Sequence, residues 1–322
     1  MAKLNYGITM DLMADIREED NACNGFTMDV SLGCPHHCVY CIFSQLEQKV
    51  YKLQNPKYNG STIPMCLDKF MQRTDFPPVV YMCYSSDPFG NEEINRVSSA
   101  AIRKLVENNV HVFISTKGRL SDEAIETLKI RPELIHFQMG IASHDDARNK
   151  IVEPGAPCFE ERLEWLHRVE EIKNIGDITV RMDPLLPGID DNEDNIRKVL
   201  SKIGSVENVV IGYVIMTSNM RNTWSKVDFL AKSASLLTER VNTVSGNELY
   251  SIPFDDKVEK LTRFREICKE YGKIMRTCGC KDERLKQTNL DWICHPFTKK
   301  VREELISNST YKVRENHFGN YD

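Results

Sequence analysis

Strand-like and helix-like segments alternate along the middle of this chain of 322 residues, and the alternation constrains its fold more than any other feature. Short apolar segments are the expected strands, and longer amphipathic segments follow them. Strands joined by helices pair in parallel, and right-handed crossovers curl such a sheet toward a barrel or a doubly wound sheet. The expected strands are residues 26–32, 79–85, 110–116, 134–141, 178–182 and 209–216, with helices at 92–109, from 121, 159–173, 192–203 and 224–241.

The region after Tyr250 departs from this alternation. It contains one helix-like stretch, residues 257–271, followed by a charged and cysteine-rich end. We therefore expect an N-terminal segment over residues 1–25, one α/β domain over residues 26–245 and a C-terminal extension over residues 246–322.

Charge and hydropathy exclude two classes of protein. A formal net charge of −5 excludes a strongly basic nucleic-acid coat, although it leaves a local basic groove open. The longest apolar runs, such as residues 78–82, fall far short of the roughly 18 residues that a membrane span needs. The first residues show no signal-peptide core, so we expect a cytoplasmic protein without membrane contact.

Eleven cysteines are many for a chain expected in the cytoplasm, where disulfides are disfavoured and clustered thiols indicate metal binding or catalysis. Cys34, Cys38 and Cys41 form a Cys-x3-Cys-x2-Cys cluster directly after the first expected strand. A structural zinc takes four ligands, whereas three thiolates on a cube of four irons leave one iron open for a cofactor. A zinc site completed by His36 or His37 is the alternative, although both histidines lie awkwardly within the loop.

The loops that follow the expected strands hold an unusual share of Cys, Ser, Asp and Gly. Ligands of parallel α/β folds bind at the carboxyl ends of the strands, so this is where chemistry is expected. The loops are residues 33–41, 85–90, 117–118, 142–144, 183–188 and 217–219.

The cysteine triad, with Tyr40 before its last cysteine, resembles the signature of radical S-adenosylmethionine (radical SAM) enzymes. The motifs at residues 84–88, 115–117, 153–157 and 181–188 follow in order and resemble the spore photoproduct lyase-like branch of that superfamily. The resemblance implies a partial (β/α)6 barrel, a [4Fe-4S] cluster on the triad and SAM bound to its open iron. It also implies a 5′-deoxyadenosyl radical that abstracts hydrogen from an unactivated carbon.

The resemblance also implies roles for single residues. Ser86 and Asp87 match contacts to the methionyl amino group and ribose, Lys117 matches a partner of the methionyl carboxylate, and Ser143 matches a ribose contact. The full set of expected SAM-binding residues is Tyr40, Ser85, Ser86, Asp87, Lys117, Ser143 and Arg181. Arg181 suits a carboxylate or phosphate because of its planar fork of donors.

The chain also departs from the lyase itself. Tyr84 stands where the lyase has a hydrogen-donor cysteine, and Cys83 comes one residue too early, which on a strand means the opposite face. Ile42 replaces the aromatic residue after the triad. We therefore expect a relative of the lyase rather than the lyase, with Tyr84 or Tyr40 as candidates for a hydrogen-atom relay.

A second cluster, Cys278-x-Cys280-x13-Cys294, lies in the expected extension. It predicts a second iron–sulfur cluster, with Cys268, His295 or substrate as the fourth ligand. A structural zinc site, or cysteines that merely pack, are the alternatives. Cys23, Cys66 and Cys158 are read as ordinary thiols.

These inferences leave three functions to compare. The first is a radical SAM enzyme acting on a nucleobase- or nucleotide-like small molecule, reduced by an external donor such as flavodoxin or ferredoxin. The second is an enzyme that modifies a peptide or small metabolite with help from the second cluster. The third is a non-catalytic zinc-binding interaction protein. Nucleic acid is a conceivable substrate, but the charge does not indicate it.

Overall fold

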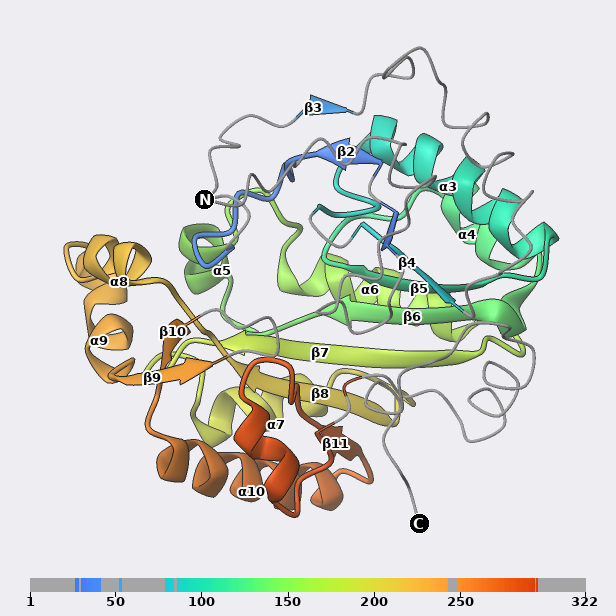
Figure 1. Ribbon diagram of the computed structural model, residues 1–322. Coiled ribbons are helices and arrows are strands. Elements are labelled where there is room, and N and C mark those ends of the chain that lie inside the picture. Colours follow the sequence, from blue (N-terminus) through green and yellow to red (C-terminus); the bar gives the residue numbers. More distant parts are fainter. Residues whose placement is uncertain are drawn as a thin grey trace.

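Seven strands form one parallel sheet in a computed structural model that describes residues 27–28, 30–41, 52–53, 79–83, 86–242, 248–292 and 294 (Figure 1). Every neighbouring pair is parallel, which confirms the predicted α/β class. In spatial order the strands are β1 (Thr27–Met28), β4 (Val79–Met82), β5 (His111–Thr116), β6 (Ile135–Gly140), β7 (Asp177–Leu185), β8 (Asn208–Tyr213) and β11 (Ile274–Arg276).

Helices connect these strands, and polar side chains cap their first turns. Asn91, Ser121, Asp145, Asn192 and Thr217 each accept a hydrogen bond from a first-turn backbone N–H. The helices are α3 (Glu92–Glu107), α4 (Asp122–Leu128), α5 (Asp146–Val152), α6 (Phe159–Glu170), α7 (Glu193–Leu200), α8 (Ser218–Trp224), α9 (Asp228–Leu236) and α10 (Phe254–Glu270).

Two expected elements are wrong in part. The helix expected over residues 224–241 is instead the end of α8, then α9, then strand β9 (Glu239–Asn242), which pairs antiparallel with β10 (Glu248–Ser251). Pairing with β10 overrides the helical pattern there, because the cross-strand partner rather than local propensity decides the conformation. The first expected strand is two short strands, β1 and β2 (Ser31–Leu32), and β2 pairs antiparallel with β3 (Lys52–Leu53).

The expected C-terminal extension begins by continuing the barrel. Its helix α10 leads into β11, which pairs with β8 at the edge of the sheet, Ile274 beside Asn208. Residues 246–322 therefore supply a strand and a covering helix to the sheet of the preceding domain, as the lower part of Figure 1 shows.

The two faces of the sheet differ in chemistry. One face is apolar and belongs to the main core, with Val80, Met82, Val112, Ile114, Phe137, Met139, Val180, Met182, Val209 and Ile211. The alternate residues point to the opposite face, which we call the inner face. Paired residues of the inner face form rows: Phe113, His136 and Asp177; then Ser115, Gln138, Thr179 and Asn208; then Gly140, Arg181, Val210 and Arg276.

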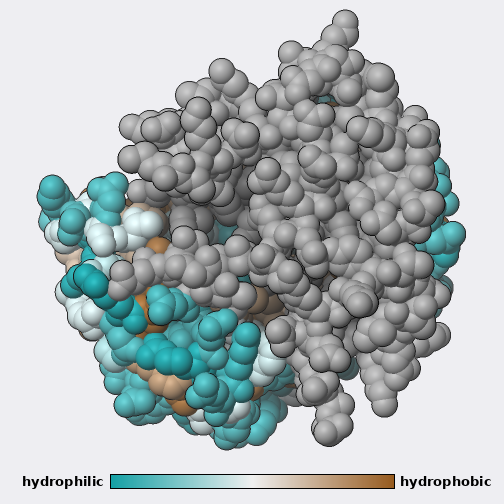
Figure 2. Space-filling view, in the orientation of Figure 1, coloured by the Kyte–Doolittle hydropathy of each residue, from teal (hydrophilic) through white to brown (hydrophobic). Residues whose placement is uncertain are grey.

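The outer surface that can be seen in Figure 2 is mostly hydrophilic where α8, α9 and α10 form it. Only a few large apolar side chains are exposed among the described residues, Val227 and Leu236 being two of them. None of the described helices is long and apolar enough to cross a membrane.

Candidate active site

The first cysteine cluster lies on the loop after β2, and burial governs its thiols. Burial, followed by the nearby Asp87 and Cys38, raises the pKa of Cys34 well above its usual value. Burial also raises the pKa of Cys38 to about 12, with Glu153 adding to it and Cys41 also near. Such thiols stay protonated unless a positive partner stabilises the thiolate, and iron or zinc is such a partner. The donor set therefore fits a metal centre.

The described residues contain no group of three or more His, Cys, Asp or Glu side chains arranged around a single metal ion. A [4Fe-4S] cube places each protein thiolate on a different iron, so its ligands surround the cube rather than meet at one ion. The relevant observation is therefore that three thiols on one short loop, Cys38 buried and Cys34 and Cys41 half-buried, lie within electrostatic reach of one another.

The segment Glu153-Pro154-Gly155 packs against the cysteine loop, and backbone hydrogen bonds join the two. The Val39 N–H donates to Val152 O at 2.9 Å, and the Gly155 N–H donates to His36 O at 2.9 Å. His36 Nδ1 returns to Gly155 O at 3.0 Å. A Cβ at Gly155 would lie 2.1 Å from Pro35 O, so only glycine allows this close approach.

Asp87 joins the cysteine loop to the end of β5. Its Oδ1 accepts from Thr116 Oγ1 at 2.6 Å and from the Phe89 N–H at 2.9 Å. Its Oδ2 accepts from the Lys117 N–H at 2.8 Å and pairs with His36 Nε2 at 3.1 Å. Burial opposes the charge, but His36 and these hydrogen bonds lower the pKa of Asp87 to about 2. Protein groups thus surround the carboxylate that the sequence assigned to SAM.

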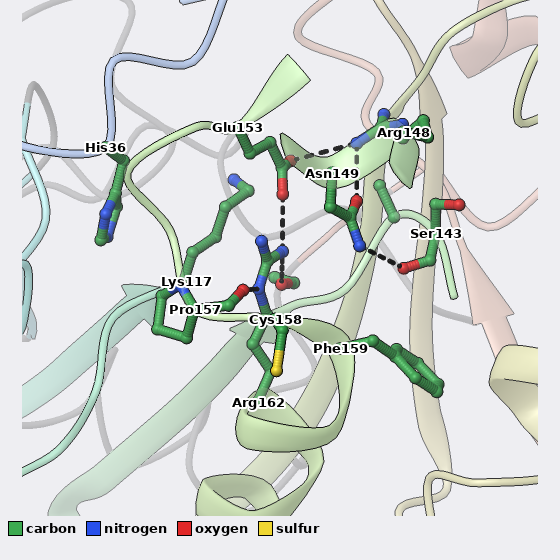
Figure 3. Close-up of polar contacts among 12 residues, drawn as sticks. His36, Lys117, Ser143, Arg148, Asn149, Glu153, Pro157, Cys158, Phe159 and Arg162 are labelled. Atoms are coloured by element: carbon green, nitrogen blue, oxygen red, sulfur yellow. Dashed lines mark hydrogen bonds and ion pairs between the residues drawn. The ribbon is translucent and has the colours of Figure 1, made fainter. Parts of the chain in front are cut away.

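Glu153 is the centre of a buried charge network on the other side of the loop (Figure 3). Its carboxylate is 1 % exposed and pairs with Arg162 Nη1 at 2.6 Å. It also accepts a short hydrogen bond from Tyr40 Oη and lies 3.7 Å from Arg148 Nη1. Burial opposes ionisation, but Arg162, Lys117 and Arg148 hold the pKa of Glu153 far below its usual range.

Tyr40 and Lys117 lie together above this network. Burial raises the pKa of Tyr40 well above its usual value, so its hydroxyl stays a donor to Glu153. Lys117 Nζ lies 5.5 Å from the centre of the Tyr40 ring. The Lys117 side chain crosses Gly140 on the inner face, where a Cβ would lie 2.8 Å from Lys117 Cγ. A cation thus stands beside the cysteine loop, as the expected role of Lys117 requires.

The remaining expected SAM contacts have different outcomes. Ser143 is buried, and its Oγ accepts from the Asp145 N–H at 3.1 Å. Ser86 is half-buried and directly precedes Asp87. Tyr84 and Ser85 lie outside the described residues. Their predicted roles, and those of the other SAM-binding residues, stay predictions.

The second cysteine cluster packs on the inner face. Cys278 and Cys294 are 5 % and 4 % exposed, and together with Cys280 they pack against Val210. Backbone hydrogen bonds from Thr277 to Asp291 (2.7 Å) and from Gly279 to Trp292 (2.9 Å) bring Cys294 back beside the other two. No disulfide occurs among the nine cysteines in the described part of the chain.

Arg181 lies beside this second cluster. Burial opposes its charge, but Asp183, Cys294 and Cys278 raise the pKa of its guanidinium further. Arg181 pairs with Asp183, which also pairs with Lys281. Two cations near the thiols, Arg181 and Lys281, thus share the carboxylate of Asp183.

Cys268, a candidate fourth ligand, lies elsewhere. It is fully buried on α10 in the main core, and burial alone raises its pKa to about 12. The structure therefore separates it from the three clustered thiols. His295, the other candidate, lies outside the described residues.

Comparison with known proteins identifies the family. The model of the radical SAM superfamily matches residues 28–203. The chain belongs to the radical SAM superfamily. This confirms the predicted family.

Individual relatives of this radical SAM enzyme are distant. Uncharacterized protein ORF301 of Acidianus two-tailed virus is 20 % identical over 194 residues, which are 57 % of this chain and 64 % of the relative, less than two thirds of its length. Spore photoproduct lyase with bound AdoMet and dinucleoside spore photoproduct has TM-score 0.59 and 12 % identity, with 81 % of this chain and 78 % of that chain covered. A second structure of the lyase, with dinucleoside spore photoproduct, has TM-score 0.60, 12 % identity and the same coverage. These matches confirm the partial barrel.

Sequence reasoning missed the residues that hold the cysteine loop. His36 was considered only as a zinc ligand, and Glu153 and Arg162 were seen only as parts of motifs. The signal was a Glu-Pro-Gly sequence and an arginine in a segment that follows a strand, but only the fold shows that they meet the loop.

Proposed function

We propose that Cys34, Cys38 and Cys41 hold a [4Fe-4S] cluster that leaves one iron for SAM. When both are bound, the cluster and SAM together supply a 5′-deoxyadenosyl radical that takes a hydrogen atom from an unactivated carbon of the substrate. The observation that carries the proposal is the loop of three clustered thiols, which Asp87 and Glu153 hold from two sides with Lys117 beside it.

The chain's own groups have separate tasks in this proposal. Lys117 offers its ammonium group to the methionyl carboxylate of SAM, with Ser86, Ser143 and Arg181 as further polar contacts. Asp87 orients Lys117 through its backbone N–H and the cysteine loop through His36. Tyr40 remains a candidate relay of a hydrogen atom, although its hydroxyl already donates to Glu153.

A nucleobase- or nucleotide-like molecule is the proposed substrate. It is supported by the dinucleoside spore photoproduct named in the two lyase structures of similar fold. A peptide or small metabolite is the alternative. An external donor such as flavodoxin or ferredoxin would reduce the cluster.

We further propose that Cys278, Cys280 and Cys294 hold a second iron–sulfur cluster. Their convergence on Val210 supports it, because Val210 faces the same side of the sheet as Gly140, which Lys117 crosses. With Cys268 placed in the main core, the fourth ligand is His295 or a substrate atom. A structural zinc ion is the alternative occupant.

The test begins with protein purified without oxygen. Analysis for iron, sulfide and zinc should find two cubanes' worth of iron and no stoichiometric zinc. Dithionite and SAM should then yield 5′-deoxyadenosine. Cys158→Ser is the matched control for the cysteine variants, because Cys158 is half-buried at the start of α6 and serine suits a helix start. Stoichiometric zinc without iron would contradict the proposal.

A further inference from the structure

Two buried polar side chains of the inner face have atoms without a partner. Gln138 and Thr179 are both fully buried and lie side by side on β6 and β7. Within the described part of the chain, neither Gln138 Nε2 nor Thr179 Oγ1 has a hydrogen-bond partner. Buried polar atoms are nearly always paired, with protein, water or a ligand, so two adjacent exceptions require an explanation.

The orientation of the Gln138 amide follows from its other contacts. Its Oε1 accepts from Arg181 Nη1 at 3.2 Å and from Ser115 Oγ at 3.3 Å. Arginine has only donors, so the oxygen must lie on that side and the NH2 group on the other. Gln138 therefore presents a donor, while the Thr179 hydroxyl beside it can donate or accept.

Gln138 and Thr179 lie close to both cysteine sites. One row further along the strands are Gly140, crossed by Lys117, and Val210, against which Cys278 and Cys294 pack. The pair thus lies on the face shared by the proposed SAM site and the second thiol cluster.

The chemistry of the pair selects a neutral ligand. Both unpaired groups are uncharged, and the nearest cation, Arg181, already has Asp183 as its partner. A neutral ligand satisfies both groups without adding a buried charge. A carbonyl oxygen suits the Gln138 donor, and an adjacent N–H suits the Thr179 oxygen.

We propose that Gln138 and Thr179 bind the substrate by an amide or lactam edge, with its carbonyl at Gln138 Nε2 and its N–H at Thr179 Oγ1. This inference rests on the proposed function. Two sources carry this chemistry. One is the lactam of a nucleobase, and the other is the amide of a peptide-like molecule.

The experiment measures binding to the anaerobic, cluster-loaded protein with SAM present. The probes are thymidine for a lactam and N-acetylalaninamide for an amide, and the readout is the rise in unfolding temperature with probe concentration. One probe should bind the parent protein, and its identity tells the two sources apart. In Thr179→Val and Gln138→Met its affinity should fall by about tenfold or more.

Thr179→Val also separates a ligand site from a site filled by ordered water. Without ligand, removing an unpaired buried hydroxyl should leave the unfolding temperature unchanged or higher. Thr127→Val is the control, because Thr127 is equally buried but its Oγ1 donates to Glu123 O at 2.8 Å. That control should unfold at a lower temperature and keep probe binding.

Two results would overturn the inference. One is a Thr179→Val protein that is less stable without ligand and still binds the probe, as a water site requires. The other is a parent protein that forms 5′-deoxyadenosine but binds neither probe. Absence of 5′-deoxyadenosine would instead count against the proposed function, so the two failures are distinguishable. Thr179→Val removes no volume of note, so it keeps the test available even if Gln138→Met does not fold.

Discussion

The two cysteine clusters of this protein face the same side of one sheet but are held in different ways. Two buried carboxylates hold the first: Asp87 through His36, and Glu153 through Tyr40 and the backbone beside it. Backbone hydrogen bonds to Asp291 and Trp292 hold the second, with a buried ion pair between Lys257 and Asp282 (2.6 Å) close by.

This difference has a consequence for how each site meets its cofactor. Buried charged networks restrict a loop before any metal arrives, and such preorganisation favours a site that must present one open iron in a fixed direction. The second site has ion pairs of its own, Lys257 with Asp282 and Lys281 with Asp183, but thirteen residues separate Cys280 from Cys294, so we expect its occupant to contribute more to its order.

The largest effect should come from the first site's own ligands. Cys38→Ala removes one of three thiolates, so no open-iron cube can be held, and formation of 5′-deoxyadenosine should be abolished. The measurement is chromatography of products after dithionite and SAM are added, with Cys158→Ser as control. Substantial product from a folded Cys38→Ala protein would place the catalytic cluster elsewhere.

The next effect concerns the buried carboxylate network. Glu153→Gln leaves Arg162 buried without its anion, and breaking such a pair costs about 3–5 kcal/mol of folding free energy. Denaturant unfolding of the variant measures it. Glu126→Gln is the control, because Glu126 pairs with Lys129 on the exposed surface, where a pair contributes about 0–1 kcal/mol. If both variants lost equally little folding free energy, the buried carboxylate network would not hold the first cysteine site as described.

The contribution of Asp87 to folding stability should depend on pH, so acid tests it. Its pKa is about 2 in the folded protein. An unfolded aspartate has a pKa near 3.9, so the ionised folded state contributes up to about 2.5 kcal/mol above that pH. Because the folded pKa is the lower one, this stability is complete above about pH 4 and is lost as the pH falls toward about 2.

Urea unfolding of the metal-free protein across that range gives the measurement. The slope of stability against pH should be shallower in Asp87→Asn than in the parent protein. Identical slopes would show that Asp87 is not the buried anion that holds the loop.

The smallest effect on SAM cleavage should come from the second site. Cys280→Ala should lose about half of the iron, as expected when one of two cubes is lost. It should keep formation of 5′-deoxyadenosine, because Cys34, Cys38 and Cys41 hold the proposed catalytic cluster. Loss of cleavage in a folded variant with a full first cluster would show instead that the second site supplies electrons to the first.

Sequence alone predicted the fold where patterns are local. The β/α alternation placed β4 to β8 within a few residues, and Ser121 marked the start of α4. It failed where pairing partners decide the outcome: the β9–β10 hairpin replaces an expected helix, and β11 joins the sheet from an expected extension.

The site shows the same division. Cysteine spacing alone indicated both thiol clusters. The sequence did not predict that Asp87, Glu153 and His36 hold the loop, because that role depends on contacts between residues far apart in the chain. Examples are His36 with Asp87 and Tyr40 with Glu153. The resemblance assigns Asp87 to SAM, which stays a prediction, and the structure adds that both of its oxygens accept hydrogen bonds from protein groups.

Electron paramagnetic resonance of the reduced Cys280→Ala protein, recorded before and after SAM is added, tests the account most directly. This variant should retain the first cluster alone. The account predicts the signal of one reduced [4Fe-4S] cluster that changes when SAM binds its open iron. A signal that SAM leaves unchanged, or a protein that holds zinc and gives no signal, would contradict it.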